Sequence, residues 1–168
     1  TDAIDVTECY RLSDTTSVDV NRQNAKAYCM LKDYKKAIER YESLKRMGDR
    51  SFLTFYYLGI SYYGDNWFYG SYDNLKEAYA KNSTDINVLY YYAKSCSRTS
   101  WKKEGVEFME KAVEIATPGD SILERLYKGL AECYGYAGES YKKIEVMNRL
   151  YKLNKDYKLF YSIARAYD

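Results

Sequence analysis

Residues 51–81, SFLTFYYLGISYYGDNWFYGSYDNLKEAYAK, carry the pattern from which the architecture of this chain follows. The small residue Gly59 has a counterpart 34 residues earlier, Ala25, and another 34 residues later, Ala93. The same shift relates aromatic and aliphatic positions along most of the chain, and a fourth copy is centred on Ala131. A fixed period of this length is typical of repeat proteins, in which each unit stacks on its neighbours. We therefore expect an array of repeats.

Each repeat is predicted to form two helices. In the first helix a small residue precedes an aromatic by three positions, as in Gly59 and Tyr62, so a neighbouring helix can approach closely beside a bulky side chain. The second helix has apolar residues at spacings of three and four, typical of a helix with one buried face. One proline and nine glycines in 168 residues favour long helices over strands and turns. The predicted N-caps are Ser17, Ser51, Asp85 and either Asp120 or Ser121.

The repeats resemble the tetratricopeptide repeat (TPR) family. The residues that match its pattern in order are Leu58-Gly59, Tyr62 and Phe68 in one repeat and Tyr28, Tyr34, Ala37 and Tyr41 in another. The resemblance implies an all-α fold, a right-handed α-solenoid of stacked antiparallel helix pairs. It also implies that the first helices line a concave groove in which extended peptides bind.

The expected organisation is a single TPR-like array over residues 1–168. It comprises a second helix of a preceding repeat at 1–14, four repeats at 18–48, 52–82, 86–117 and 121–155, and the first helix of a fifth at 157–168. Because the array starts and ends within a repeat, we expect a fragment of a longer repeat protein. Its open ends also permit self-association.

Composition excludes several classes of function. The 26 Lys and Arg residues are balanced by 24 Asp and Glu residues, which disfavours a nucleic-acid binder, and no apolar run is long enough to insert into a membrane. Histidine is absent, the four cysteines are dispersed, and no phosphate-binding glycine loop occurs, so we expect neither an enzyme nor a cofactor or metal site. We expect Cys29, Cys96 and Cys133 to be buried thiols, which favours the cytoplasm without deciding the compartment.

The resemblance assigns ligand binding to first-helix positions that flank each small residue. Across the array these positions hold seven basic and three acidic residues, together with several tyrosines. Concentrated positive charge attracts anionic ligands, and tyrosine supplies flat contact area at low entropic cost. The candidate groove residues are Arg22, Lys26, Tyr56, Ile60, Tyr63, Tyr90, Lys94, Lys128 and Tyr161. The predicted partner is a protein or an extended acidic peptide with an apolar anchor.

The sequence is compared with three functional classes of helical-repeat protein. The leading one is a non-catalytic scaffold for protein interaction, and the second is a regulatory or sensor module attached to a signalling or DNA-binding output domain. RNA binding by a related helical-repeat family fits less well, because that family has a period near 35 and this chain has a mild net charge of +2. The basic and asparagine residues with which some TPR proteins grip the C-terminus of chaperones are not reproduced here, since Tyr57 and Tyr91 occupy two of those positions.

Overall fold

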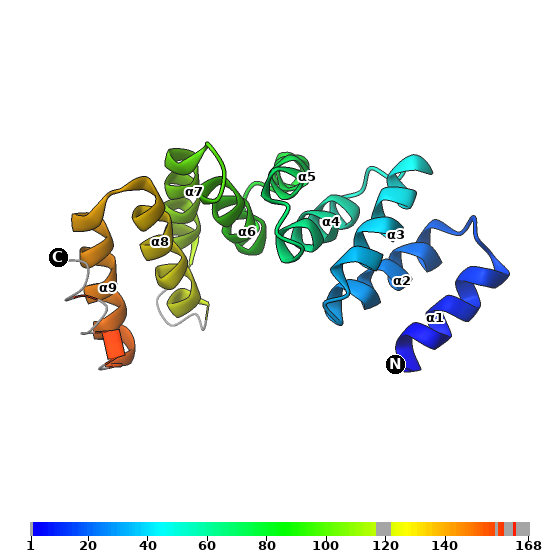
Figure 1. The fold of residues 1–168 in the computed structure, drawn as a ribbon, viewed down its shortest axis with the longest axis horizontal. Coiled ribbons are helices and arrows are strands. Elements are labelled where there is room, and N and C mark those ends of the chain that lie inside the picture. Colours follow the sequence, from blue (N-terminus) through cyan, green and yellow to red (C-terminus); the bar gives the residue numbers. More distant parts are fainter. Residues whose placement is uncertain (1, 117–121, 157, 160–162, 164–168) are drawn as a thin grey trace. The chain divides into compact units, whose positions relative to one another are not determined.

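The computed structural model describes residues 2–116, 122–156, 158–159 and 163 (Figure 1). The chain divides into two compact units, residues 1–83 and 84–168. Helices of the first unit are α1 (Asp2–Ser13), α2 (Val18–Met30), α3 (Tyr34–Arg46), α4 (Phe52–Gly64) and α5 (Phe68–Lys81). Those of the second are α6 (Ile86–Ser97), α7 (Lys102–Ile115), α8 (Leu123–Ala137) and α9 (Ser140–Asn154). No strand occurs among the described residues, so the fold class is all-α as expected.

Local signals set the helix ends. The side chains of Ser17, Ser51 and Asp85 accept hydrogen bonds from backbone N–H groups of the first turns of α2, α4 and α6, as the sequence predicts. Gly48, with a φ of 91°, follows α3 in the left-handed conformation that glycine adopts most readily. The predicted caps Asp120 and Ser121 lie outside the described residues, and α8 begins after Ile122 without a side-chain cap.

Consecutive helices pack as pairs. The tightest pairs within the units are α2 with α3, α4 with α5, α6 with α7 and α8 with α9, and α1 packs on α2. At the α4–α5 contact, a Cβ atom built on Gly59 would lie 2.5 Å from Cγ of Leu75. Ala93 of α6 is fully buried, and its carbonyl oxygen would lie 2.8 Å from a Cβ atom on Gly105 of α7. Gly59 and Ala93 therefore lie where the first and second helices of a repeat approach closely.

A tyrosine–glutamate hydrogen bond joins successive repeats. Tyr28 of α2 donates to Glu8 of α1 at 2.8 Å, and Tyr62 of α4 donates to Glu42 of α3 at the same distance. Tyr134 of α8 makes the same bond to a glutamate of α7. Each phenol therefore connects a first helix to the second helix of the preceding repeat.

One pair of positions breaks this pattern. Lys76 and Cys96 have the same 20-residue spacing as Glu8 and Tyr28, but they offer neither a carboxylate nor a phenol. The boundary between the two compact units falls between these residues. The sequence thus offers no tyrosine–glutamate pair at these two positions.

The cores are built from the predicted apolar stripes. In the first unit Tyr41, Leu44 and Leu58 are fully buried and cluster with Ala25 and Tyr62. In the second unit the buried residues include Val88, Leu89, Met109, Leu126 and Leu150. Among the described helices, none combines the length and the apolar character that a bilayer crossing requires.

Replacing Gly59 with alanine tests the close approach. We expect Gly59→Ala to lower the free energy of unfolding by about 1–3 kcal/mol, because the added methyl group would overlap Leu75. The control is Gly135→Ala, whose Cβ atom would meet only Lys143 at ordinary contact distance and which should be neutral or stabilising by up to ~1 kcal/mol. Urea unfolding followed by circular dichroism measures both. Equal stability of the two variants would show that the packing register is wrong.

Thiol labelling tests the burial of the cysteines. Cys29, Cys96 and Cys133 are buried and free, as predicted, whereas Cys9 is exposed on α1. Burial raises the pKa of all three, that of Cys133 to about 11 despite hydrogen bonding to Ser97, so their reactive thiolate forms are scarce at neutral pH. We expect mass spectrometry to find a single alkylated thiol in the native protein and four after denaturation. A disulfide between any two of the buried cysteines would contradict this.

Candidate functional site

In the first unit the candidate groove residues lie on α2 and α4, whose exposed side we call the first-helix face, and the two helices pack against each other directly. Tyr56 stacks on Phe52 with ring centroids 5.7 Å apart and meets Tyr57 edge-on at 5.0 Å. The Lys26 ammonium lies 5.5 Å from the centre of the Tyr57 ring. Lys26 is exposed and has no carboxylate partner among the described residues. This face therefore combines half-buried aromatic surface with one uncompensated cation.

Two further predicted residues border this face. Ile60 is half-buried and packs against the buried cluster of Tyr28, Cys29 and Ala37. Tyr63 meets Phe68 edge-on with centroids 5.5 Å apart. Both side chains thus pack against neighbouring residues and are also partly exposed on this face.

Arg22 is held by carboxylates. Its guanidinium contacts Asp49 at 2.9 Å and Asp19 at 2.8 Å. Asp49 also accepts hydrogen bonds from the Thr54 hydroxyl at 2.6 Å and from the Ser51 backbone N–H at 2.9 Å. Although burial raises the pKa of Asp49, these donors and Arg22 lower it to about 2. Arg22 therefore links α2 to the turn between α3 and α4, and little of its charge is left for a ligand.

The first-helix face of the second unit is formed by α6 and α8, which also pack directly against each other. Lys94 of α6 pairs with Glu132 of α8, and Lys128 pairs with Glu124 at 2.5 Å within α8. Tyr90 is half-buried and meets Tyr91 edge-on at 5.2 Å. The two predicted lysines are thus neutralised by acidic neighbours.

Arg125 completes this face. Its guanidinium carbon lies 4.6 Å from the centre of the Tyr90 ring, and Nη2 donates to the Asn87 side-chain oxygen at 2.6 Å. Arg125 is one of the seven basic residues at the first-helix positions, but it is not one of the nine candidate groove residues. The signal available was its position on a first helix, whereas its stacking on Tyr90 depends on how α6 and α8 pack. The remaining candidate, Tyr161, lies outside the described residues.

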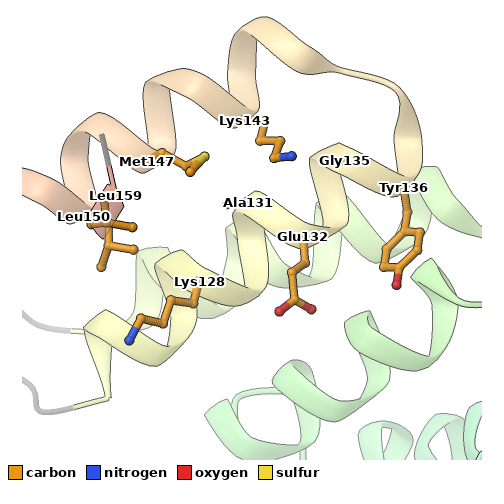
Figure 2. A pocket seen from close by; sticks show the side chains of 9 residues that line it. All are labelled: Lys128, Ala131, Glu132, Gly135, Tyr136, Lys143, Met147, Leu150 and Leu159. Carbon is orange, nitrogen blue, oxygen red and sulfur yellow. The ribbon is translucent and has the colours of Figure 1, made fainter. Parts of the chain in front are cut away.

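A hollow of about 560 Å³ lies between α8 and α9 (Figure 2). Its apolar lining comes from Ala131, Met147 and Leu150, with Leu159 beside Leu150. Gly135 also borders the hollow and, as a glycine, adds no side chain to it. In the first unit, the corresponding surface of α2 and α3 is where α4 packs. By the same geometry, this hollow corresponds to the surface of α2 and α3 that α4 covers in the first unit.

Metal chemistry has no support in the described part of the chain. No group of three or more cysteines and carboxylates is close enough to hold an ion there.

The chain is similar to known proteins in its structure. No family model and no curated protein matches the sequence. YrrB, described as a TPR protein with an unusual peptide-binding site, matches with a TM-score of 0.82 and 15% identity, over 96% of this chain and 81% of its own. MamA from residue 41 to its end, from Desulfovibrio magneticus RS-1, matches with a TM-score of 0.81 and 16% identity, over 92% of this chain and 85% of its own.

A third similar structure is also that of a TPR protein. TTC0263, a thermophilic TPR protein of Thermus thermophilus, has a TM-score of 0.66 and 14% identity, over 97% of this chain and 88% of its own. The chain has the TPR fold. The fold class predicted from the 34-residue period is therefore confirmed.

Within this TPR fold, acid should weaken the Arg22–Asp49 link. The pKa of Asp49 is lowered from 3.8 to about 2, so the link stabilises the protein above about pH 4 and is lost as the pH falls towards 2. We expect Asp49→Asn to cost on the order of 2 kcal/mol at pH 7 and much less near pH 2. Urea unfolding at a series of pH values measures this difference.

The matched control is Asp73→Asn, at an exposed position of α5. This variant should unfold like the wild type at every pH. A difference between wild type and Asp49→Asn that stays constant with pH would contradict the assignment.

Proposed function

We propose that this chain is a non-catalytic protein-interaction scaffold whose first-helix faces, one in each unit, bind extended acidic peptides. The observation that carries the proposal is the recurrence, in both units, of a cation over a tyrosine ring on these faces: Lys26 over Tyr57 and Arg125 over Tyr90. The TPR fold supports it, as does the peptide-binding site named for YrrB.

The two kinds of side chain have different roles in binding. Uncompensated cations such as Lys26 raise the rate of association with an anionic peptide and make that rate sensitive to salt. Aromatic surface such as that of Tyr56 and Tyr90 slows dissociation, because an apolar anchor packed on it is removed from water. An acidic peptide with an aromatic or aliphatic anchor satisfies both.

A further surface lies on α1. Val6 is 54% exposed and Tyr10 is 64% exposed, and with Asp5, Cys9 and Ser13 they border a hollow of about 520 Å³. Self-association through this apolar face stays a prediction, separate from peptide binding.

Selection from a displayed library of random twelve-residue peptides tests the proposal. We expect the wild-type chain to enrich peptides that contain Asp or Glu together with an aromatic or aliphatic residue. Surface plasmon resonance on an enriched peptide should then show that Lys26→Glu mainly slows association, whereas Tyr56→Ala mainly speeds dissociation, each by about tenfold.

Two controls change the same residue types elsewhere. Lys35→Glu replaces an exposed lysine of α3, and Tyr141→Ala replaces an 87% exposed tyrosine of α9. Both should bind like the wild type. The proposal is wrong if no peptide is enriched, or if the controls weaken binding as much as the first-helix variants do.

A further inference from the structure

The Tyr90–Arg125 pair differs from the other charged groups of the second unit. Lys94 and Lys128, on the same face, each have a glutamate partner. Arg125 has no carboxylate partner among the described residues, although it is only partly exposed. Its Nε atom is buried and has no hydrogen-bond acceptor within the part of the chain that the structure describes. Within the described residues, the hydrogen bonding of this guanidinium is therefore incomplete.

The guanidinium is held in place from two sides. The Tyr90 ring supports its face at 4.6 Å, and the Asn87 oxygen accepts from Nη2 at 2.6 Å. Gly129, one turn further along α8, allows this approach, because a Cβ atom there would lie 3.0 Å from the Tyr90 ring. Fixing the plane of an arginine before binding reduces the entropic cost of using it.

The charge of the site limits the ligand. Arg125 also lies in the first turn of α8, where the helix dipole adds positive potential. The pairs Lys94–Glu132 and Lys128–Glu124 beside it are neutral, so among the described residues of this face the charge of Arg125 is left without a carboxylate partner. One charge on a planar fork matches a singly charged, planar carboxylate better than a doubly charged phosphate.

We propose that Arg125, positioned by Tyr90 and Asn87, is a receptor for a carboxylate of the bound peptide. The inference rests on the proposed function and names the contact by which the second unit selects acidic ligands. The carboxylate forms charge-assisted hydrogen bonds to the Nη atoms that the Asn87 contact leaves available. Asn87 and Tyr90 act as positioning residues.

Nuclear magnetic resonance with three defined pentapeptides tests this contact. The first probe is acetyl-Gly-Glu-Phe-Glu-Gly-amide, the second carries Gln in place of both Glu residues, and the third is the Gln peptide with a free terminal carboxylate. The Nε–Hε signal of Arg125, assigned by its loss in Arg125→Lys, should shift saturably with the first peptide and not with the second. A shift with the third would identify a terminal carboxylate as a ligand of the same receptor.

Variants separate recognition from folding. Arg125→Gln should weaken binding of the Glu peptide at least about tenfold and leave the weaker binding of the Gln peptide unchanged, because only the charged contact is lost. A merely structural role would weaken both peptides equally, and that result would overturn the inference. The control Arg149→Gln, at an arginine of α9 that pairs with Glu145, should leave both affinities unchanged.

The Arg125 receptor and the proposed peptide binding can fail separately. Enrichment of peptides in the library selection, together with no response of the Arg125 signal to any carboxylate, would overturn the receptor and leave peptide binding standing. Failure of the selection itself would overturn the proposed function.

Discussion

The close approach of paired helices is the constraint on which the rest of the structure depends. Gly59 brings α4 so near to Leu75 of α5 that no side chain fits between them, and Ala93 has the same place between α6 and α7. Because each pair is tight on one side, its other side chains are directed either to the neighbouring repeat or to the first-helix face. The side chains that form the first-helix faces are therefore a consequence of where the small residues lie.

Electrostatic pairing decides which of the predicted groove cations remain available. Arg22 is committed to Asp49 and Asp19, and Lys94 to Glu132. Asp49 and Glu132 lie on other helices or turns, so tertiary packing brings these opposite charges together. Lys26 and Arg125 instead lie over tyrosine rings, where a cation is attracted to the π face without being neutralised.

The high tyrosine content has two uses. Tyr28 and Tyr62 occupy the position three residues after the small residue, and their hydroxyls reach carboxylates of the preceding repeat. Tyr56 and Tyr90 lie three residues before it, on the first-helix face. An amphipathic ring with a polar tip suits both places: at Tyr28 and Tyr62 the hydroxyl reaches a carboxylate, and at Tyr56 and Tyr90 the ring packs against another aromatic ring.

The sequence by itself determined the local and periodic features. Helix caps such as Ser17 and Ser51, the small residues of the close approaches and the buried stripe through Tyr41 and Leu44 could be predicted, because each depends on spacing along one helix or between consecutive helices. The 34-residue period extends the same reasoning to the whole TPR fold.

Only the tertiary structure decided which charges are satisfied and which are not. The Arg22–Asp49 link joins residues 27 apart, and Arg125 meets Asn87 across 38 residues. A periodic pattern specifies which face of a helix a residue occupies, but not whether a long, flexible side chain on that face finds an opposite charge on the next helix. That depends on distances of a few ångströms between helices, which packing alone sets.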